Sequence, residues 1–250
     1  MRIAHSLPIV LILAVLVLLW IPSSGMIKEA SAAEFSPSGD TFLDTYNPDQ
    51  NYGGSSTINV EGGSTMVYKQ RALLKFDLSS IPSSMIITKA TLRLYASGYW
   101  TPITAQTLTV YRVTQDWDES QATWNSRLTG TGWTGTDPAG AGGTWTTTGS
   151  VTQPAVSSGW ISWDATDIVK AWVESGEDNF GFIVKLTDES GSNYWQQFAS
   201  STYYDSESRP ILDVEYPYMD IEQNGVPVNT LDIPVGSTFT VDVLGTKHPK

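Results

Sequence analysis

The sequence contains no cysteine, only two histidines and few basic residues, and each scarcity excludes a class of protein. Without cysteine there are neither disulfides nor thiolate metal sites. The histidines are His5 and His248, near the two ends of the 250-residue chain, so the central region lacks the histidine of a serine triad. Fourteen Lys and Arg against 26 Asp and Glu give a net charge of −12, and no basic run marks a nucleic-acid interface.

The first 33 residues have the organisation of a signal peptide. Arg2 precedes an apolar run from Leu7 to Ile21, and the small residues Ala30-Ser31-Ala32 form a cleavage pattern. The run is shorter than the roughly 20 residues that a membrane-spanning helix needs, so an anchored form is the weaker alternative. The leader predicts a secreted protein, extracellular or at the cell surface.

Apolar and polar residues alternate along most of the remaining chain, which is typical of antiparallel strands that are buried on one face. Ala72, Leu74 and Phe76 are predicted to face inward, while Arg71 and Lys75 face outward. The pattern predicts about eight strands, at residues 40–46, 57–60, 72–78, 90–96, 107–113, 160–163, 182–186 and 212–216. This number of strands suits an all-β, two-sheet jelly-roll sandwich.

Three other segments interrupt this pattern. Residues 166–175 are predicted to form one short helix, capped by Asp164 or Thr166 and ended by Gly176. Residues 129–159 are rich in Gly, Thr and Ser and are predicted to be a long surface loop or an irregular hairpin. A boundary is expected near Pro217, and residues 218–250 resemble a linker and the start of an immunoglobulin-like or cohesin-like module.

The motifs of the central region resemble those of the DNRLRE-type domain, the disaggregatase-related repeat of secreted and cell-surface proteins. The segments that carry the resemblance are Asp40–Asp44 with Asn51-Tyr52-Gly53, Ala72–Pro82, Ala90–Tyr95, Trp117–Asn125, Trp163–Trp172, Asn179–Phe182 and Arg209–Tyr216. They occur in the family's order and place the domain at residues 34–217. The resemblance implies a jelly-roll sandwich, and some family members bind acidic polysaccharides such as alginate.

Sugar-binding sites need flat aromatic faces with polar neighbours, because sugar C–H groups stack on aromatic rings. The tryptophans within the family motifs, at 117, 124, 163 and 172, are interpreted as core residues. The aromatic residues expected to be exposed and to bind the ligand are the turn pairs Tyr99-Trp100, Tyr194-Trp195 and Tyr203-Tyr204, together with Trp133 and Trp145. Of these, Trp133 and Trp145 have the context expected to be the most exposed.

A row of cations is the second candidate ligand site. Lys69, Arg71 and Lys75 have the same strand parity, and Arg93 joins them if its strand is adjacent. Such a row predicts charge-assisted contacts with uronic-acid carboxylates. An ordinary solvated strand surface is the alternative interpretation.

Oxygen ligands are dense near the start of the domain, at Asp40, Asp44, Asn47, Asp49 and Asn51, which suggests a structural Ca²⁺. Turn formation by these residues is the alternative interpretation. Carboxylates are frequent elsewhere too, but no spacing singles out an acid-base pair, so no catalytic residue is assigned.

The sequence therefore favours a non-catalytic carbohydrate-binding module, with polysaccharide, including uronic-acid-containing polysaccharide, and neighbouring domains of a longer protein as partners. Nucleic acid is not expected. The alternatives are a structural repeat of a cell-surface or matrix assembly and, less favoured, a polysaccharide lyase or hydrolase.

Overall fold

The computed structural model describes residues 31–63, 68–83, 85–100, 106–135, 141–190 and 193–216, together with two short strands at 222–223 and 226–227. The chain divides into two units, residues 28–218 with 244–250 and residues 1–27 with 219–243. In the second unit, β14 (Glu222–Gln223) pairs antiparallel with β15 (Val226–Pro227). Residues 1–30 of the predicted leader and most of the predicted module at 218–250 lie outside the described residues. No helix in the described part of the chain is long and apolar enough to cross a membrane.

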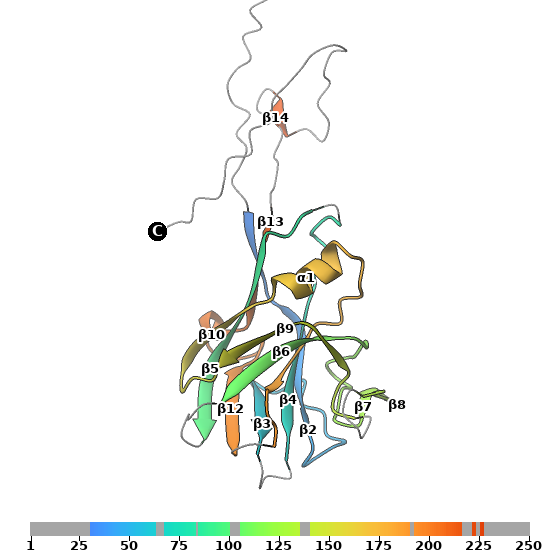
Figure 1. The fold of residues 1–250 in the computed structure, drawn as a ribbon, viewed down its shortest axis with the longest axis vertical. Helices are drawn as coiled ribbons and strands as arrows, with labels where there is room; N and C mark the ends of the chain where they lie inside the picture. The colour runs from blue at the N-terminus through green and yellow to red at the C-terminus, as the bar shows by residue number, and fades with distance from the viewer. Residues whose placement is uncertain are drawn as a thin grey trace, which may run out of the picture. The chain divides into compact units, whose positions relative to one another are not determined.

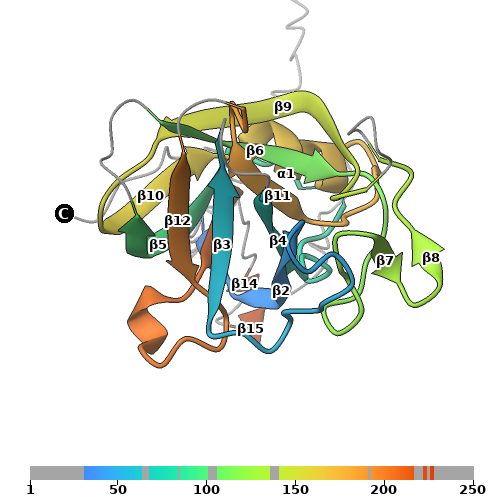
Figure 2. The ribbon, with the colours of Figure 1, turned by 90° about the horizontal axis from the view of Figure 1, so that it is seen from below.

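In its described residues, the larger unit contains one curled, eleven-stranded antiparallel sheet, one small two-stranded sheet and one α-helix (Figure 1). Its strands are β1 (Ser31–Phe35), β2 (Pro37–Asp44), β3 (Thr57–Gly62), β4 (Gln70–Phe76), β5 (Lys89–Trp100), β6 (Thr107–Val113), β9 (Trp145–Pro154), β10 (Gly159–Asp164), β11 (Phe182–Leu186), β12 (Tyr194–Ala199) and β13 (Ile211–Tyr216). The strand order is β1-β13-β5-β12-β3-β4-β11-β6-β9, with β10 added to β5 and β2 added to β4. In Figure 2, β6 and β9 run across the direction of β12 and β3, which shows the curl.

This arrangement confirms the predicted all-β, jelly-roll-like sandwich, and all eight predicted strands are present. Alternate residues of the strands form the first core, which fills the space inside the curl. Ala72, Leu74 and Phe76 point into it as predicted, and Leu92 and Leu94 do the same from β5. The exclusion of these side chains from water is the main stabilising contribution of the fold.

The predicted helix is α1 (Thr166–Val173), which buries Ile168, Val169 and Trp172 on one side. Asp164 lies just before the helix and accepts a hydrogen bond from the Thr166 N–H at 3.1 Å, so it satisfies one of the free N–H groups at the helix start. α1 therefore starts where the sequence predicts and ends two residues earlier.

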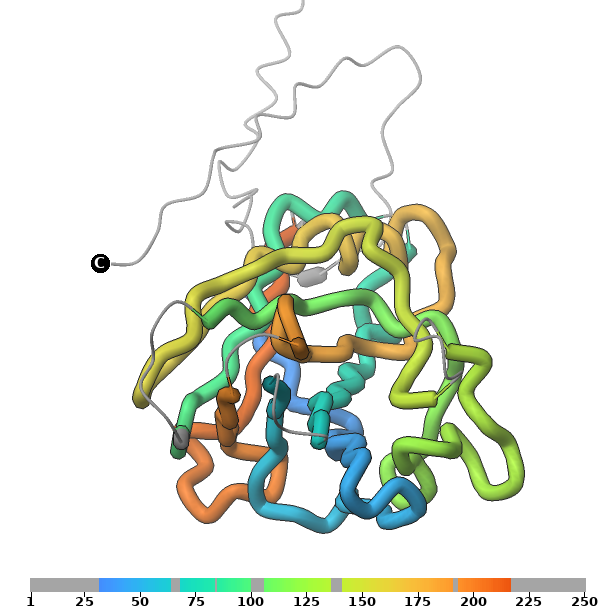
Figure 3. The backbone as a smooth tube through the Cα atoms, turned by 60° about the horizontal axis from the view of Figure 1, so that its bottom comes forward, coloured from blue at the N-terminus to red at the C-terminus, as the bar shows by residue number. Residues whose placement is uncertain are grey.

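A second core lies on the outer side of the sheet and consists of Leu43, Leu73, Val113, Trp117, Ala122, Trp124, Trp133 and Ile183. The segment between β6 and β9, which contains the small strands β7 (Ser126–Leu128) and β8 (Thr131–Gly132), supplies four of these residues. In Figure 3 this green segment lies at the side of the sandwich, beside the blue chain that follows β2. As a result, β11 is buried on both faces, and all five of its residues are buried.

The prediction for residues 129–159 is wrong in its second half. β9 is a ten-residue strand of the main sheet, paired with β6 over Thr107–Val113. A search for apolar alternation misses β9. Both faces of the strand are half-buried or exposed, so polar Thr and Ser residues can occupy either face.

Candidate functional site

The four cations predicted to form a row do not form one. They are separated from one another in the sheet, and each lies against a carboxylate. Arg71 and Lys75 project from the same face of β4, but Leu73 of the second core lies between them. Arg93 does not join them, since β12 and β3 separate its strand β5 from β4. Within the described residues, Lys69 and Arg71 lie against Glu189, Lys75 against Asp116 and Arg93 against Asp213.

Arg71 is 1% exposed, which corrects the expectation that it projects into solvent. Its Nε and Nη2 donate to the two carboxylate oxygens of Glu189 at 2.7 and 2.8 Å, a bidentate pair. The guanidinium lies over the rings of Trp124 and Trp145, at 4.6 and 4.9 Å from their centroids. Arg71 thus contacts two aromatic rings and a carboxylate.

Two lysines share the same carboxylate. The Nζ of Lys185 lies 3.5 Å and that of Lys69 lies 3.9 Å from Glu189 Oε2. Burial lowers the pKa of Lys185, Glu189 opposes this change, and the positive charges of Arg71 and Lys69 lower the pKa further. Three cations around one shared carboxylate create a positive potential here, and we call Lys69, Arg71, Lys185 and Glu189 the Glu189 cluster.

The Glu189 cluster is open to the surface on one side. The side chains of Lys69 and Glu189 are 36% and 10% exposed. Tyr111 and Trp145, whose ring centroids lie 5.7 and 5.9 Å from the Lys185 Nζ, are half-buried. Their ring centroids lie 5.9 Å apart. Aromatic rings and cations therefore meet at one place, as a site for a charged sugar requires.

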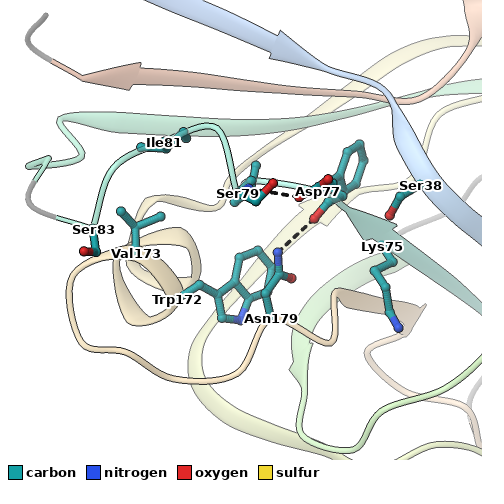
Figure 4. A pocket seen from close by; sticks show the side chains of 11 residues that line it. Ser38, Lys75, Asp77, Ser79, Ile81, Ser83, Trp172, Val173 and Asn179 are labelled. Atoms are coloured by element: carbon teal, nitrogen blue, oxygen red, sulfur yellow. Dashed lines mark hydrogen bonds between the residues drawn. The ribbon is translucent and has the colours of Figure 1, made fainter.

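Lys75 lies between two adjoining pockets of about 560 and 250 Å³, which we call the Lys75 groove. Trp172 and Val173 of α1 form one wall of the larger pocket, and Ser79, Ile81 and Ser83 form another (Figure 4). The Lys75 Nζ donates to Asp116 Oδ1 and to the Trp117 carbonyl oxygen, each at 2.8 Å.

The charge of the Lys75 groove differs from that of the Glu189 cluster. Asp77, Asp118 and Glu119 line the two pockets. Hydrogen bonds from Ser79 lower the pKa of Asp77, and those from Ser120 lower the pKa of Asp118, so both are ionised at neutral pH. A polyanion is therefore disfavoured in this groove.

The aromatic residues predicted to bind ligand fall into distinct environments. Trp133, expected to be among the most exposed, is only 5% exposed, because it packs in the second core and its Nε1 donates to the Thr123 carbonyl oxygen. Tyr194 is 1% exposed, and its hydroxyl donates to Gln196. These two expectations of exposure are wrong, since the segments taken as loop and turn fold onto the sheet.

The other predicted aromatic residues reach the surface to different extents. Tyr99-Trp100 and Tyr194-Trp195 belong to the paired strands β5 and β12 rather than to turns. Tyr99 is 48% exposed and Tyr204 is 86% exposed, whereas Tyr203, Trp145 and Trp195 are half-buried. The side chain of Trp100 lies outside the described residues. The four motif tryptophans are 0–8% exposed, which confirms their interpretation as core residues.

Each of the five residues predicted to hold calcium has a hydrogen-bond partner within the fold. Asp40 accepts from the Ser201 N–H, Asp44 from the Tyr46 N–H and the Tyr52 hydroxyl, and Asp49 from Asn125. Asn47 donates to the Tyr52 hydroxyl, and Asn51 donates to the carbonyl oxygens of Glu119 and Ala122. Among the described residues, no three His, Cys, Asp or Glu are grouped as a metal site would require. Calcium binding stays a prediction, to be tested by melting the protein with and without a chelator.

A jelly-roll sandwich that presents aromatic and charged side chains at its surface has the architecture of a carbohydrate-binding domain. Residues 31–214 match carbohydrate-binding module family 96, and the chain belongs to this family. The match supports the predicted class of domain, while the DNRLRE assignment stays a prediction.

The chain also resembles parts of much larger proteins. It is 29% identical over 196 residues to the tRNA3(Ser)-specific nuclease WapA of Bacillus spizizenii and to the tRNA nuclease WapA of Bacillus subtilis strain 168. The matched region is 74% of this chain and 8% of each relative. The chain therefore spans less than a tenth of the length of these curated relatives.

Proposed function

We propose that this chain is a non-catalytic carbohydrate-binding module that acts outside the cell and recognises acidic polysaccharide through the Glu189 cluster. Membership of carbohydrate-binding module family 96 supports the binding of a polysaccharide. The uronic-acid preference rests on the charge of the site. The extracellular location rests on the leader pattern of residues 1–33.

The observation that carries the proposal is the sharing of one carboxylate by three cations. Glu189 pairs with the buried guanidinium of Arg71, and the Lys69 Nζ lies 3.9 Å from the same carboxylate. The Lys69 side chain is 36% exposed, so a ligand carboxylate can approach it from solvent. A uronate provides such a carboxylate at the edge of a pyranose ring. The half-buried rings of Trp145 and Tyr111 lie beside the cations and can stack on that ring.

The contacts of four carboxylates support a binding module rather than an enzyme. Glu119 accepts a hydrogen bond from the Asp40 N–H, and Asp118 accepts hydrogen bonds from Ser120. Glu189 pairs with Arg71, and Asp164 lies at the start of α1. Each of these four carboxylates therefore has a hydrogen-bond or ion-pair partner within the fold. The nuclease names belong to relatives of which the matched region is 8%.

The alternative of a structural repeat in a surface assembly has one observation in its favour, the small share of the relatives that the chain matches. A scaffold would show no affinity for a polysaccharide. The same binding experiment therefore separates the two functions.

Affinity electrophoresis in gels that contain alginate or polygalacturonate tests the proposal. We expect retention that decreases with added salt, since exposed charges are screened within about 10 Å at 0.1 M. Lys69→Gln is expected to weaken binding about tenfold, because it removes a charge-assisted contact. The matched control is Lys170→Gln on α1, which changes the same charge outside the cluster and is expected to leave retention unchanged.

Any of three outcomes would contradict the proposal. Wild-type protein that is not retained by any uronate gel would exclude acidic polysaccharide as the ligand. Retention that is equally strong for Lys69→Gln and wild type would exclude the Glu189 cluster as the site. Release of unsaturated products or reducing ends would show catalysis instead.

A further inference from the structure

Aromatic side chains from three distant segments meet on the outer side of β10, β5 and β13. Tyr95 of β5 and Trp160 of β10 are directly paired in the sheet, with ring centroids 5.5 Å apart and planes at 77°. Their strand neighbours Leu94 and Ile161 point to the first core and are 0% and 4% exposed. By the alternation of strands, Tyr95 and Trp160 face outward, where both are half-buried.

The loop between β12 and β13 extends this surface. Tyr203 and Tyr204 have ring centroids 4.5 Å apart, and Tyr204 is 86% exposed. A hydrogen bond with Tyr204 is the main cause that raises the pKa of Tyr203, and the nearby Tyr95 and Asp205 also raise it. Ile211 of β13 is the sheet partner of Arg93 in β5, and the Nε of Arg209, two residues before Ile211, donates to the Tyr203 carbonyl oxygen at 2.9 Å. The loop therefore lies beside the Arg93–Tyr95 segment of β5, and the loop and the strand pair form one surface. We call Arg93, Tyr95, Trp160, Tyr203 and Tyr204 the tyrosine face.

Arg93 completes the tyrosine face without making it basic. Its guanidinium lies 4.7 Å from the centroid of the Trp160 ring and 3.4 Å from Asp213 Oδ2. Asp205 and the exposed Glu207 lie in the same loop as the tyrosines. Arg209 also lies there, since its Nε donates to the Tyr203 carbonyl oxygen. Two cations among three carboxylates leave the face with a net negative charge, which disfavours a polyanion, in contrast to the Glu189 cluster.

We propose that the tyrosine face is a second binding surface, which takes a neutral polysaccharide. Chains of β-linked hexose or pentose rings fit its chemistry, because such rings present apolar C–H faces to aromatic side chains and hydroxyl groups to Arg93 and Asp213. The inference rests on the proposed carbohydrate-binding function but uses none of the residues of the Glu189 cluster. β12 and β3 lie between the two surfaces in the sheet order.

The experiment compares two variants of the full chain in gels that contain hydroxyethylcellulose, xylan or alginate. Tyr204→Ala removes the most exposed ring of the face and is expected to weaken retention by a neutral polysaccharide about tenfold, while retention by alginate is unchanged. Tyr46→Ala is the matched control, because Tyr46 is also strongly exposed, at 63%, but lies in the loop after β2. An unchanged melting temperature shows that Tyr204→Ala folds normally.

Four outcomes overturn the inference in distinguishable ways. If wild type is retained by alginate but by no neutral polysaccharide, the tyrosine face is not a sugar site, although the proposed function stands. If none of the three gels retains the protein, both proposals fail. If Tyr204→Ala weakens retention by alginate, the face belongs to the acidic site. If it abolishes only a concentration-dependent dimer, measured by ultracentrifugation, the face binds a second copy of this chain.

Discussion

Asp40 is a buried carboxylate whose environment favours its neutral form. It is 2% exposed, and burial raises its pKa from 3.8 to about 6, against the hydrogen bonds from Ser201 that lower it. The charge of Glu119, which accepts the Asp40 N–H, raises the pKa further. The ionised form of Asp40 at neutral pH therefore destabilises the fold.

The pH dependence of Asp40→Asn tests this conclusion. Because the pKa of Asp40 is higher in the folded than in the unfolded state, its contribution to stability is complete below pH 3.8 and is lost as the pH rises through about 6. At about 1.4 kcal/mol per pKa unit, the variant should be more stable than wild type by up to ~3 kcal/mol at pH 7. The asparagine oxygen can still accept the Ser201 N–H. Urea unfolding should show the difference at pH 7 and none near pH 4; an equal difference at both values would contradict it.

Individual side chains also show where prediction from sequence ends. The alternation of β4 correctly assigns Ala72, Leu74 and Phe76 to the core, because strand parity is a local property. The same alternation places Arg71 in solvent, yet Arg71 is buried against Glu189, 118 residues away. Nothing near Arg71 in the sequence indicates this partner, and only tertiary structure brings the two together.

The segment between α1 and β11 contains two glycines, Gly176 and Gly181. Both have left-handed backbone conformations, but their surroundings differ. Gly176 after α1 has φ of +70° and Gly181 before β11 has φ of +82°. A Cβ on Gly176 would meet no atom within 4 Å, whereas a Cβ on Gly181 would lie 2.1 Å from the Leu74 carbonyl oxygen. Gly181 therefore permits the close approach of β11 to β4.

Alanine substitution at the two glycines separates backbone strain from steric clash. Gly176→Ala should cost about 1 kcal/mol, because left-handed backbone is strained for a residue with a Cβ. Gly181→Ala should cost at least ~3 kcal/mol, since the β4–β11 pairing must also shift. Urea unfolding of both variants at neutral pH measures this; equal costs would show that the chain near Leu74 relaxes freely.

Two strands that escaped prediction, β9 and β12, share a physical cause. β12 has the sequence Tyr194-Trp195-Gln196-Gln197-Phe198-Ala199, and its glutamines interrupt the apolar pattern. Gln196 is nevertheless 0% exposed and donates to the Gly98 carbonyl oxygen at 2.7 Å. A buried amide that is satisfied by a distant carbonyl cannot be recognised from sequence periodicity, and neither can the Thr-rich β9.

On the scale of the whole domain, the first strand overlaps the predicted leader. The signal peptide is predicted to comprise residues 1–33, whereas β1 begins at Ser31. Residues 31–33 pair with Tyr216, Glu215 and Val214 of β13, and Val214 is fully buried. The last three residues of the predicted leader are therefore part of the sheet.

A comparison of chains that start at Ser31 and at Glu34, both ending at residue 250, tests the contribution of this segment. Removing three paired residues should cost about 1–3 kcal/mol. For a domain of this size, this lowers the melting temperature by about 2–4 °C per kcal/mol. Differential scanning calorimetry measures the change; equal melting temperatures would show that the first three residues of β1 contribute nothing.

The pairing of β1 with β13 also determines how the domain responds to mechanical load. Because the strands are antiparallel, Ser31 lies opposite Tyr216, so the chain enters and leaves the domain at one edge (Figure 1). A force that pulls Ser31 and Tyr216 apart acts in the unzipping geometry, so it loads the β1–β13 hydrogen bonds one at a time rather than all together in shear. In a long protein under tension, β1 would detach from β13 at low force while the rest of the domain stayed folded. The released segment would lengthen the chain and so limit the rise in tension.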